Sequence, residues 1–234
     1  MARAPKLLGV WPLGDLATYI EFSPTLDLEV NAFVQRLALA VHARKEPELR
    51  DVVPALGGLA LHFHPQFTGD LVQFTLSVVQ RALEDGLPPP AEVGREVEVP
   101  VCYAAKFAPD LAEVARRLKL EPEEVARRHA AGEYRVLMIG FAPGHAYMGG
   151  LHPSLALSRR ATPRPEVPAG SVAIANEQTV VYPYAISGGW NVIGRTPLVI
   201  FDAAREQPSL FGPGDRVRFR AISLAEFEDM EKHD

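Results

Sequence analysis

Cysteine is almost absent from this chain, since Cys102 is the only one among its 234 residues. A single cysteine excludes an internal disulfide and a cysteine-cluster metal site, and its scarcity favours a reducing compartment. It stands in the alternating run EVEVPVCYA, where a small buried hydrophobic side chain is the simplest interpretation.

Long apolar runs are missing as well. No stretch reaches the roughly twenty apolar residues that a membrane-spanning helix needs. Near the start of the chain, Pro12, Gly14 and Asp15 interrupt the apolar residues that a targeting leader would need. We therefore expect a cytoplasmic protein that does not cross a membrane.

An excess of basic charge is also lacking. The formal net charge is −5 and the isoelectric point is near 5.8, so a nucleic-acid partner is not expected. Four arginines do cluster, at positions 116, 117, 127 and 128. Their helical spacing and their acidic neighbours indicate a solvated helix face.

Several catalytic and nucleotide-binding motifs do not occur. The chain contains no G-x-x-x-x-G-K-S/T or G-x-G-x-x-G fingerprint, no G-x-S-x-G elbow and no H-E-x-x-H helix. His62 and His64 alternate with apolar residues and would share one face of a strand, as a pair of metal ligands requires. No third ligand accompanies them, and surface histidines explain the pattern equally well, so no metal is expected.

The first ninety residues predict a small α+β domain of the order ββαββα. Short apolar runs that alternate with turn residues indicate strands, and residues 27–44 and 69–86 have the apolar spacing of helices. Asp70 lies near the start of the second helix, and Gly86 is a candidate for its C-cap. Helices that cover one face of a sheet are the expected arrangement.

Three successive prolines, Pro88 to Pro90, stiffen the chain into a connector, so we place a domain boundary near residue 90. In the second domain, 91–234, two short helices come first, with Asp110 as a candidate cap and Pro122 in a first turn. Short apolar runs separated by Gly and Pro then predict a mainly β domain built as a closed or nearly closed barrel.

Residues 140–151, GFAPGHAYMGGL, combine four glycines with large side chains. A turn needs only glycines and a core needs only aromatics, so the combination is typical of backbone that approaches a ligand. His145 can transfer protons near neutral pH, although a packing histidine is the simpler interpretation. Singly, each residue here and in the segment 159–190 has a structural explanation, such as a core position for Trp190.

The density of arginines, hydrogen-bonding groups and flat side chains in the segment 159–190 nevertheless favours a small-molecule pocket shared with the glycine-rich run. Arg160 would hold an anionic group, Gln178 and Thr179 would orient a carbonyl, and Tyr147 with Trp190 would form apolar walls. Arg160, Gln178 and Thr179 are our candidate catalytic residues. The candidate binding residues are Phe141, Gly144, His145, Tyr147, Gly149, Gly150, Tyr182 and Trp190.

The segments GFAPGHAYMGGL, RRATPRPEVPAGSVAIANEQTVVYPY, GGWNVIGRTPLVIFD and PGDRVRF closely resemble a known family. It contains the B subunit of bacterial ATP-dependent 5-oxoprolinase and the KipI inhibitor of a sporulation histidine kinase. Members are also called allophanate hydrolase subunit 1 or carboxyltransferase subdomains C and D. The resemblance covers nearly the whole chain, and it implies a small α+β domain followed by a cyclophilin-like β-barrel domain with a pocket.

This sequence departs from the family pattern around the expected pocket. The family usually has Phe-Pro-Tyr where this chain has His145, Ala146 and Tyr147, and Asp-Pro where it has His152 and Pro153. Asn176 and Glu177 replace a Gly-Gly pair, and alanines at 104 and 105 replace further glycines. The departures leave the substrate less determined than the fold.

The resemblance implies a subunit, inactive alone, of a complex that converts 5-oxoproline, ATP and water to glutamate. Partners would be A-type and C-type subunits, with ATP as co-substrate and no tightly bound cofactor. The alternative is an inhibitor that docks on the dimerisation domain of a histidine kinase. A third possibility, carboxyl transfer in a urea carboxylase or allophanate pathway, requires a biotin carrier and a carboxylase partner that this chain does not contain.

Overall fold

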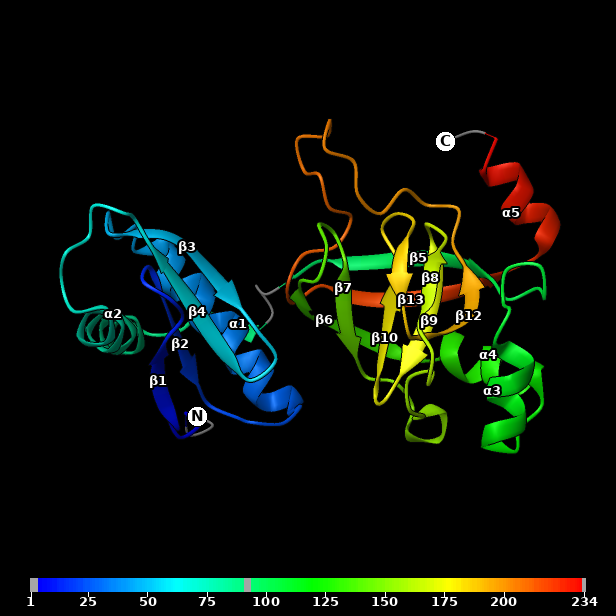
Figure 1. Ribbon diagram of the computed structural model, residues 1–234, viewed down its shortest axis with the longest axis horizontal. Coiled ribbons are helices and arrows are strands. Elements are labelled where there is room, and N and C mark those ends of the chain that lie inside the picture. Colours follow the sequence, from blue (N-terminus) through cyan, green and yellow to red (C-terminus); the bar gives the residue numbers. More distant parts are fainter. Residues whose placement is uncertain (1–3, 91–93, 233–234) are drawn as a thin grey trace. The chain divides into compact units, whose positions relative to one another are not determined.

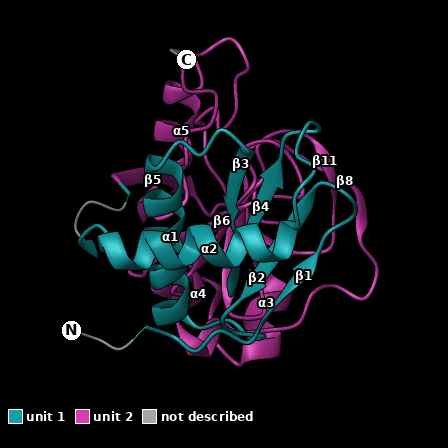
Figure 2. Cartoon of the chain, turned by 90° about the vertical axis from the view of Figure 1, so that its left-hand side faces the viewer, with its two compact units in different colours: residues 1–94 teal, residues 95–234 magenta. Residues whose placement is uncertain are grey.

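The computed structural model describes residues 4–90 and 94–232 of the chain (Figure 1). The chain divides into two compact units, Met1–Gly94 and Arg95–Asp234 (Figure 2). Whether each unit is an independently folding domain with a boundary near residue 90 stays a prediction, because compactness alone does not test independent folding.

Unit 1 is a four-stranded antiparallel sheet with two helices. Its elements in chain order are β1 (Gly9–Pro12), β2 (Ala17–Glu21), α1 (Leu28–Ala43), β3 (Leu49–Pro54), β4 (Gly58–Phe63) and α2 (Leu71–Asp85). The strand order is β1-β2-β4-β3. Both helices lie over the same face of the sheet (Figure 2), and side chains of helices and strands, such as Leu37, Val78 and Leu61, form one hydrophobic cluster.

The helices of unit 1 begin and end where their sequence signals indicate. The Asp70 carboxylate accepts hydrogen bonds from the backbone N–H groups of Val72 and Gln73, as an N-cap does. Gly86 ends α2 with a φ of +94°, a conformation that side chains disfavour. The cap expected at Asp70 and the C-cap expected at Gly86 are both confirmed.

Unit 2 is built around a closed seven-stranded barrel of strand order β10-β7-β6-β13-β5-β12-β9. The elements of unit 2 are β5 (Glu96–Cys102), α3 (Leu111–Leu118), α4 (Pro122–Ala130), β6 (Glu133–Ile139), β7 (Ala146–Gly149), the 3-10 turn η2 (Pro153–Leu155), β8 (Arg164–Val167), β9 (Ser171–Ala175), β10 (Gln178–Val181), β11 (Ile186–Gly188), β12 (Asn191–Arg195), β13 (Arg216–Ile222) and α5 (Leu224–Met230). The expectation of a closed β-barrel is confirmed.

Two hydrophobic clusters occupy opposite faces of the barrel wall. Successive residues of a strand point to opposite sides, and in β9 Val172 and Ile174 belong to the main core while Ala173 and Ala175 belong to a second cluster. The main core also contains side chains of α3 and α4. The second cluster includes Val167 at the end of β8, so the two-stranded β8–β11 sheet covers part of the outer side of the barrel.

Four details of unit 2 bear on the sequence expectations. Cys102 is buried at 1% exposure and Pro122 occupies the first turn of α4, both as expected. Asp110 occupies the N-cap position of α3, but its side chain makes no capping hydrogen bond, which corrects the role expected for it. Helix α5 was not expected. Among the described residues, no helix combines the length and apolar character needed to cross a membrane.

Candidate functional site

A pocket of about 210 Å³ lies over the outer cluster of the barrel. Three separate segments form it: the loop leading into β7 with β7 itself, the segment before β8, and the stretch from the end of β10 to β12. Its lining residues are Phe141, His145, Tyr147, Arg159, Pro163, Tyr182, Ser187, Gly188, Gly189 and Trp190.

Aromatic rings form a continuous wall of this pocket. The His145 ring centroid lies 5.4 Å from that of Phe141, 4.9 Å from that of Tyr147 and 5.4 Å from that of Tyr182. The ring centroids of Tyr147 and Trp190 are 5.9 Å apart in an edge-to-face arrangement. Such a wall offers flat apolar surface to a ligand.

Phe141 has an unusual backbone conformation at the rim of the pocket. Its φ is +70°, in the left-handed region that side chains other than glycine rarely adopt, and 66% of the residue is exposed. Strain of this kind gathers at functional sites, where the surrounding structure maintains it. An exposed aromatic ring held in a strained loop favours contact with a ligand or a partner over a role in the core.

The titratable wall residues are held in their neutral forms. Burial lowers the pKa of His145 to about 4, so the imidazole is neutral at pH 7. Its Nδ1 atom is buried and has no hydrogen-bond partner among the described residues. Burial also raises the pKa of Tyr182 to about 12 and raises the pKa of Tyr147 above its usual value. These three groups therefore offer neutral hydrogen-bonding atoms.

Arg159 supplies the positive charge of the pocket. Its guanidinium lies 5.4 Å from the ring centroid of Trp190, a cation–π contact. Within residues 4–90 and 94–232, no carboxylate forms an ion pair with it. Sequence reasoning chose Arg160 for this role, but the neighbouring Arg159 is the arginine that reaches the pocket.

Arg160 belongs to a buried charge cluster centred on Asp110. The Asp110 side chain is only 4% exposed. Its Oδ1 accepts from Arg160 Nη1 at 2.5 Å and from Arg164 Nη2 at 2.7 Å, and its Oδ2 accepts from Arg164 Nη1 and from the Val192 backbone N–H, each at 2.7 Å. The cluster therefore satisfies the carboxylate with four hydrogen bonds.

Each donor to Asp110 lies within two positions of a residue that lines the pocket. Arg160 follows Arg159 directly, Arg164 follows Pro163, and Val192 lies two positions after Trp190. The Arg160 backbone N–H also donates to the Gly189 carbonyl at 2.8 Å. Asp110 therefore fixes the positions of two pocket-forming segments without entering the pocket itself, a role that the helix-cap interpretation missed.

The structure brings together five of the predicted residues, namely Phe141, His145, Tyr147, Tyr182 and Trp190. Arg160, Gln178 and Thr179 do not line the pocket, which corrects the expectation of one shared pocket; their catalytic roles stay predictions. Val180 belongs to the outer cluster, and successive strand residues point to opposite faces, so Thr179 points into the barrel. Gln178 begins β10 and does not reach the lining, and its buried Nε2 has no hydrogen-bond partner among the described residues.

Thr179 belongs to a satisfied hydrogen-bond chain in the barrel interior. Its hydroxyl donates to the Ala173 carbonyl at 3.1 Å, so its oxygen accepts from His129 Nε2 at 2.9 Å. The His129 Nδ1 then accepts from the Tyr103 hydroxyl at 2.7 Å. Burial lowers the pKa of His129 to about 3, which keeps this ring neutral. With every member partnered, the chain stabilises the core.

The predicted glycines do not line the pocket, and packing within the chain accounts for two of them. Gly144 has a φ of +75°, and a Cβ there would lie 2.8 Å from Phe201 Cβ; Gly150 has a φ of +100°, and a Cβ would lie 2.3 Å from the Glu133 carbonyl oxygen. Gly149 pairs with Arg135 between β7 and β6. The glycine that this site requires is Gly188, where a Cβ would lie 2.1 Å from Tyr182 Oη.

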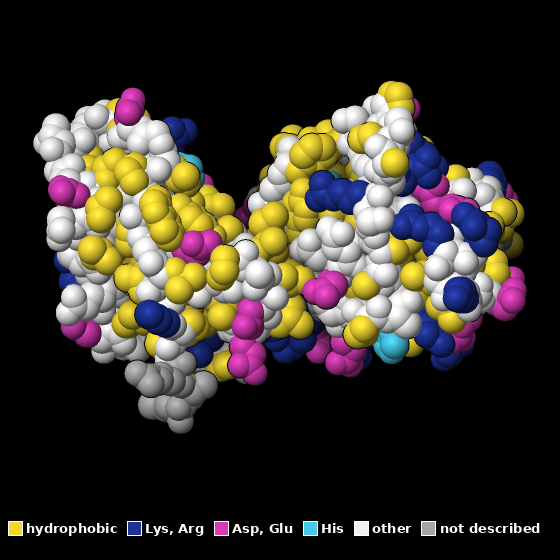
Figure 3. Space-filling model, turned by 60° about the horizontal axis from the view of Figure 1, so that its bottom comes forward, with side chains coloured by type: hydrophobic (Ala, Val, Ile, Leu, Met, Phe, Trp, Pro, Cys, Tyr) yellow, Lys and Arg dark blue, Asp and Glu magenta, His cyan; other side chains and the backbone are white. Residues whose placement is uncertain are grey.

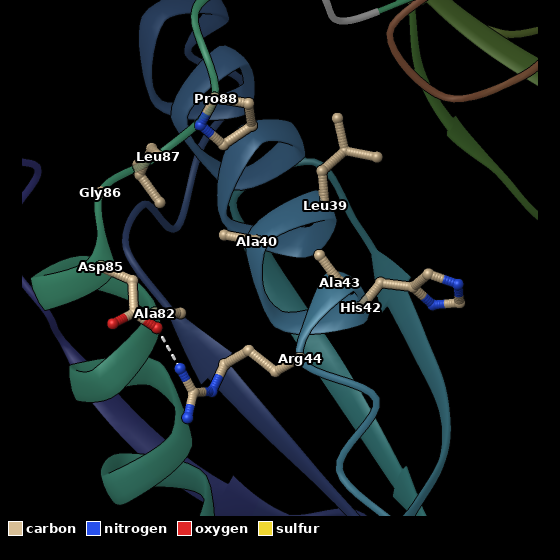
Figure 4. A pocket seen from close by; sticks show the side chains of 10 residues that line it. All are labelled: Leu39, Ala40, His42, Ala43, Arg44, Ala82, Asp85, Gly86, Leu87 and Pro88. Carbon is tan, nitrogen blue, oxygen red and sulfur yellow. Dashed lines mark hydrogen bonds and ion pairs between the residues drawn. The ribbon is translucent and has the colours of Figure 1, made fainter.

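A larger cavity of about 900 Å³ lies in unit 1, between the C-terminal ends of α1 and α2 (Figure 4). Its lining residues are Leu39, Ala40, His42, Ala43, Arg44, Ala82, Asp85, Gly86, Leu87 and Pro88. The Arg44 and Asp85 side chains pair with each other. None of the ten carries a buried polar atom without a partner, so this groove has volume but little chemistry, and we take the smaller pocket as the candidate site.

Three of the four clustered arginines of α3 and α4 pair with glutamates, and the fourth, Arg117, donates to Ser158 Oγ at 2.9 Å. Arg116 pairs with Glu113 at 2.6 Å and Arg127 with Glu124 at 2.7 Å. Figure 3 shows basic side chains of unit 2 lying beside acidic ones. These residues form a solvated face and take no part in the pocket.

Known proteins are similar to this chain in sequence and in fold. The family described as "Carboxyltransferase domain, subdomain C and D" matches residues 8–211. The 5-oxoprolinase B subunit of Bacillus subtilis is 39% identical over 223 residues, which are 92% of this chain and 93% of that protein.

Solved structures share this fold. The crystal structure of TTHA0988 has a TM-score of 0.76 at 39% identity; the match covers 88% of this chain, but this chain spans only 40% of that one. The K. lactis urea amidolyase shares the fold with a TM-score of 0.72, although the two sequences are only 16% identical. That match covers 97% of this chain and 16% of the urea amidolyase chain. The chain thus belongs to the carboxyltransferase subdomain C and D family, with the 5-oxoprolinase B subunit among its members.

Proposed function

We propose that this protein is a subunit of an ATP-dependent 5-oxoprolinase complex, which opens the lactam of 5-oxoproline to give glutamate. The observation that carries the proposal is the similarity to the 5-oxoprolinase B subunit of B. subtilis over more than nine-tenths of both chains. Similarity of this extent leaves little room for a different architecture.

The pocket has a chemistry that suits such a substrate. 5-Oxoproline is a five-membered lactam with one carboxylate, and the pocket combines flat aromatic walls, neutral hydrogen-bonding groups and one arginine. Amide resonance makes the lactam carbonyl a poor electrophile. Transfer of the γ-phosphoryl group of ATP to the lactam oxygen activates that carbon. Attack by one water then breaks the ring C–N bond and gives γ-glutamyl phosphate with a free amino group. A second water hydrolyses this acyl phosphate to glutamate and phosphate.

ATP itself does not suit this pocket. A cavity of about 210 Å³ is smaller than the roughly 300–1,000 Å³ of typical ligand sites, and a single arginine cannot neutralise three phosphates. We therefore assign nucleotide binding to a surface completed by A-type or C-type partner subunits. On this basis we expect the chain alone to be inactive. As a separate part of the proposal, we place the complex in the cytoplasm.

Other expectations from the family resemblance stay predictions. Among them are the cyclophilin-like classification of the barrel, inhibition of a histidine kinase and carboxyl transfer with a biotin carrier. The shared fold with urea amidolyase at 16% identity does not favour carboxyl transfer over lactam hydrolysis.

The test is reconstitution of the complex from purified proteins. We expect ATP-dependent formation of glutamate from 5-oxoproline when this chain is combined with its A-type and C-type partners, and no turnover when any protein or ATP is omitted. Failure of the complete mixture to form glutamate would reject the proposal. An autophosphorylation assay with a histidine kinase would then test the alternative function.

A further inference from the structure

The three arginines near the pocket differ in whether a carboxylate pairs with them. Arg160 and Arg164 donate to the buried Asp110 carboxylate and are committed to it. Arg159 has no such partner among the described residues, and it is the only charged side chain of the ten that line the pocket. The cavity therefore presents one uncompensated positive charge, which favours a ligand with one anionic group.

The contact with Trp190 suits Arg159 for this role. An arginine that lies on an aromatic ring keeps its N–H groups in the plane of the guanidinium, where they point away from the ring. This planar fork matches the two oxygens of a carboxylate, and such paired hydrogen bonds are among the stronger ones in proteins. The guanidinium lies 5.4 Å from the Trp190 ring centroid, which places this fork beside the flat wall of the pocket.

The rest of the lining is neutral and flat. The His145 imidazole and the Tyr147 and Tyr182 hydroxyls offer uncharged hydrogen-bonding atoms, as an amide group requires. Among the described residues, no aspartate or glutamate lines the pocket, so those residues offer no counter-charge to a ligand with an amine cation. A small planar ring fits between aromatic walls better than an open, flexible chain with several charges.

We propose, on the basis of the proposed function, that this pocket holds the substrate as a small cyclic monocarboxylate and that Arg159 is the residue that binds its carboxylate. The ring lies against the aromatic wall of Tyr147 and Trp190, and the lactam faces the neutral polar groups around His145. Arg159, and not Arg160, then determines the preference for a carboxylate.

Direct binding to the full chain tests this assignment. The chain has two tryptophans, Trp11 and Trp190, so a Trp11→Phe background lets fluorescence report on Trp190 alone. The probes are 5-oxoproline, 2-pyrrolidinone, which lacks the carboxylate, and cyclopentanecarboxylate, which lacks the lactam. We expect 5-oxoproline to bind at least about tenfold more tightly than 2-pyrrolidinone, as a charge-assisted hydrogen bond implies.

Substitution of Arg159 gives the decisive comparison. Arg159→Gln is expected to abolish most of the preference for 5-oxoproline over 2-pyrrolidinone and to leave the affinity for 2-pyrrolidinone nearly unchanged. Arg159→Lys keeps the charge but loses the planar fork, so it should retain part of the preference. Arg218→Gln, which removes an exposed arginine of β13 that pairs with Glu133 of β6, is the matched control and should retain the full preference.

The outcomes separate this inference from the proposed function. An Arg159→Gln chain that keeps the full carboxylate preference, or a wild-type chain that has none, overturns the inference. A complex that hydrolyses 5-oxoproline with the same KM in the Arg159→Gln and wild-type forms also overturns it but leaves the proposed function intact. A complex that does not hydrolyse 5-oxoproline, while its chain shows Arg159-dependent binding of cyclic carboxylates, rejects the function and supports the inference.

Discussion

Each unit of the molecule has an arginine–aspartate pair beside a cavity, but the two pairs lie in different surroundings. In the groove of unit 1, Asp85 pairs with Arg44 while 66% of its side chain is exposed (Figure 4). In unit 2, the Asp110 side chain is 4% exposed and accepts four hydrogen bonds. Exposed pairs contribute little to stability, whereas a buried carboxylate must be fully satisfied. The buried pair therefore fixes its pocket, and the exposed pair leaves its groove adaptable.

The two cavities also differ in whether their polar side chains are already paired. The groove of unit 1 is the larger, at about 900 Å³, yet its charged side chains pair with each other. The pocket of unit 2 is about 210 Å³ and contains an unpaired arginine and a buried imidazole nitrogen without a partner among the described residues. Of these two cavities, the smaller one is therefore the one that offers unpaired polar groups to a ligand.

Removal of the two aspartates is expected to separate the pairs most clearly. Asp110→Ala leaves two arginines and the Val192 N–H without their acceptor, so we expect unfolding free energy to fall by about 3 kcal/mol. This lies at the lower end of the range for broken buried pairs, because both arginines partly reach solvent. Asp85→Ala should lower it by less than about 1 kcal/mol.

Urea unfolding of both variants measures this difference. If the two substitutions change the unfolding free energy equally, burial does not distinguish the pairs. Asp110→Asn keeps the shape of the side chain and serves as a further control. Its stability should lie between those of the wild type and Asp110→Ala.

Local sequence signals predicted much of the fold. The caps of α2 and the short apolar runs of the barrel depend on neighbouring residues, which a sequence displays directly. Helix α5 was not predicted, because its seven residues show barely two turns of apolar spacing. Its start was nevertheless marked by Ser223 followed three residues later by Glu226, whose backbone N–H donates to the serine hydroxyl.

The site could be predicted only in part, because some of its features depend on residues far apart in the chain. The aromatic wall was found from its density, but the choice between Arg159 and Arg160 depends on Asp110, which lies 50 positions from Arg160. Asp110 itself stands before a helix, where the sequence indicates a cap. The inward direction of Thr179 follows from the register of β10 in the closed barrel, which no local pattern specifies.

The adjacent glycines Gly188 and Gly189 provide a second test of how tightly the pocket of unit 2 is packed. A Cβ at Gly188 would lie 2.1 Å from Tyr182 Oη, and Tyr182 is only 1% exposed, so the ring has little room to move. We expect Gly188→Ala to lower the unfolding free energy by about 1–3 kcal/mol, as overpacking does, and to weaken ligand binding in the pocket. Gly189→Ala places its Cβ at an ordinary 3.6 Å from Pro163, so it should change the unfolding free energy by less than about 1 kcal/mol. Equal effects in thermal unfolding would show that Tyr182 gives way easily.

The effect expected to be smallest near neutral pH concerns the buried pocket wall, because it develops only as the pH falls. Burial lowers the pKa of His145 from 6.5 to about 4 in the folded chain. As pH falls below 6.5, the unfolded chain binds a proton that folded His145 does not, so stability decreases until about pH 4. This one residue contributes a slope of up to about 1.4 kcal/mol per pH unit in that window. His145→Phe removes the contribution and keeps an aromatic ring, so its stability should fall less between pH 6.5 and 5 than that of the wild type.

His129, whose pKa burial lowers to about 3, is present in both proteins and leaves a common residual slope. Urea unfolding at several pH values measures both slopes, and identical slopes would mean that His145 is solvated or hydrogen-bonded in its charged form, contrary to a dry pocket wall.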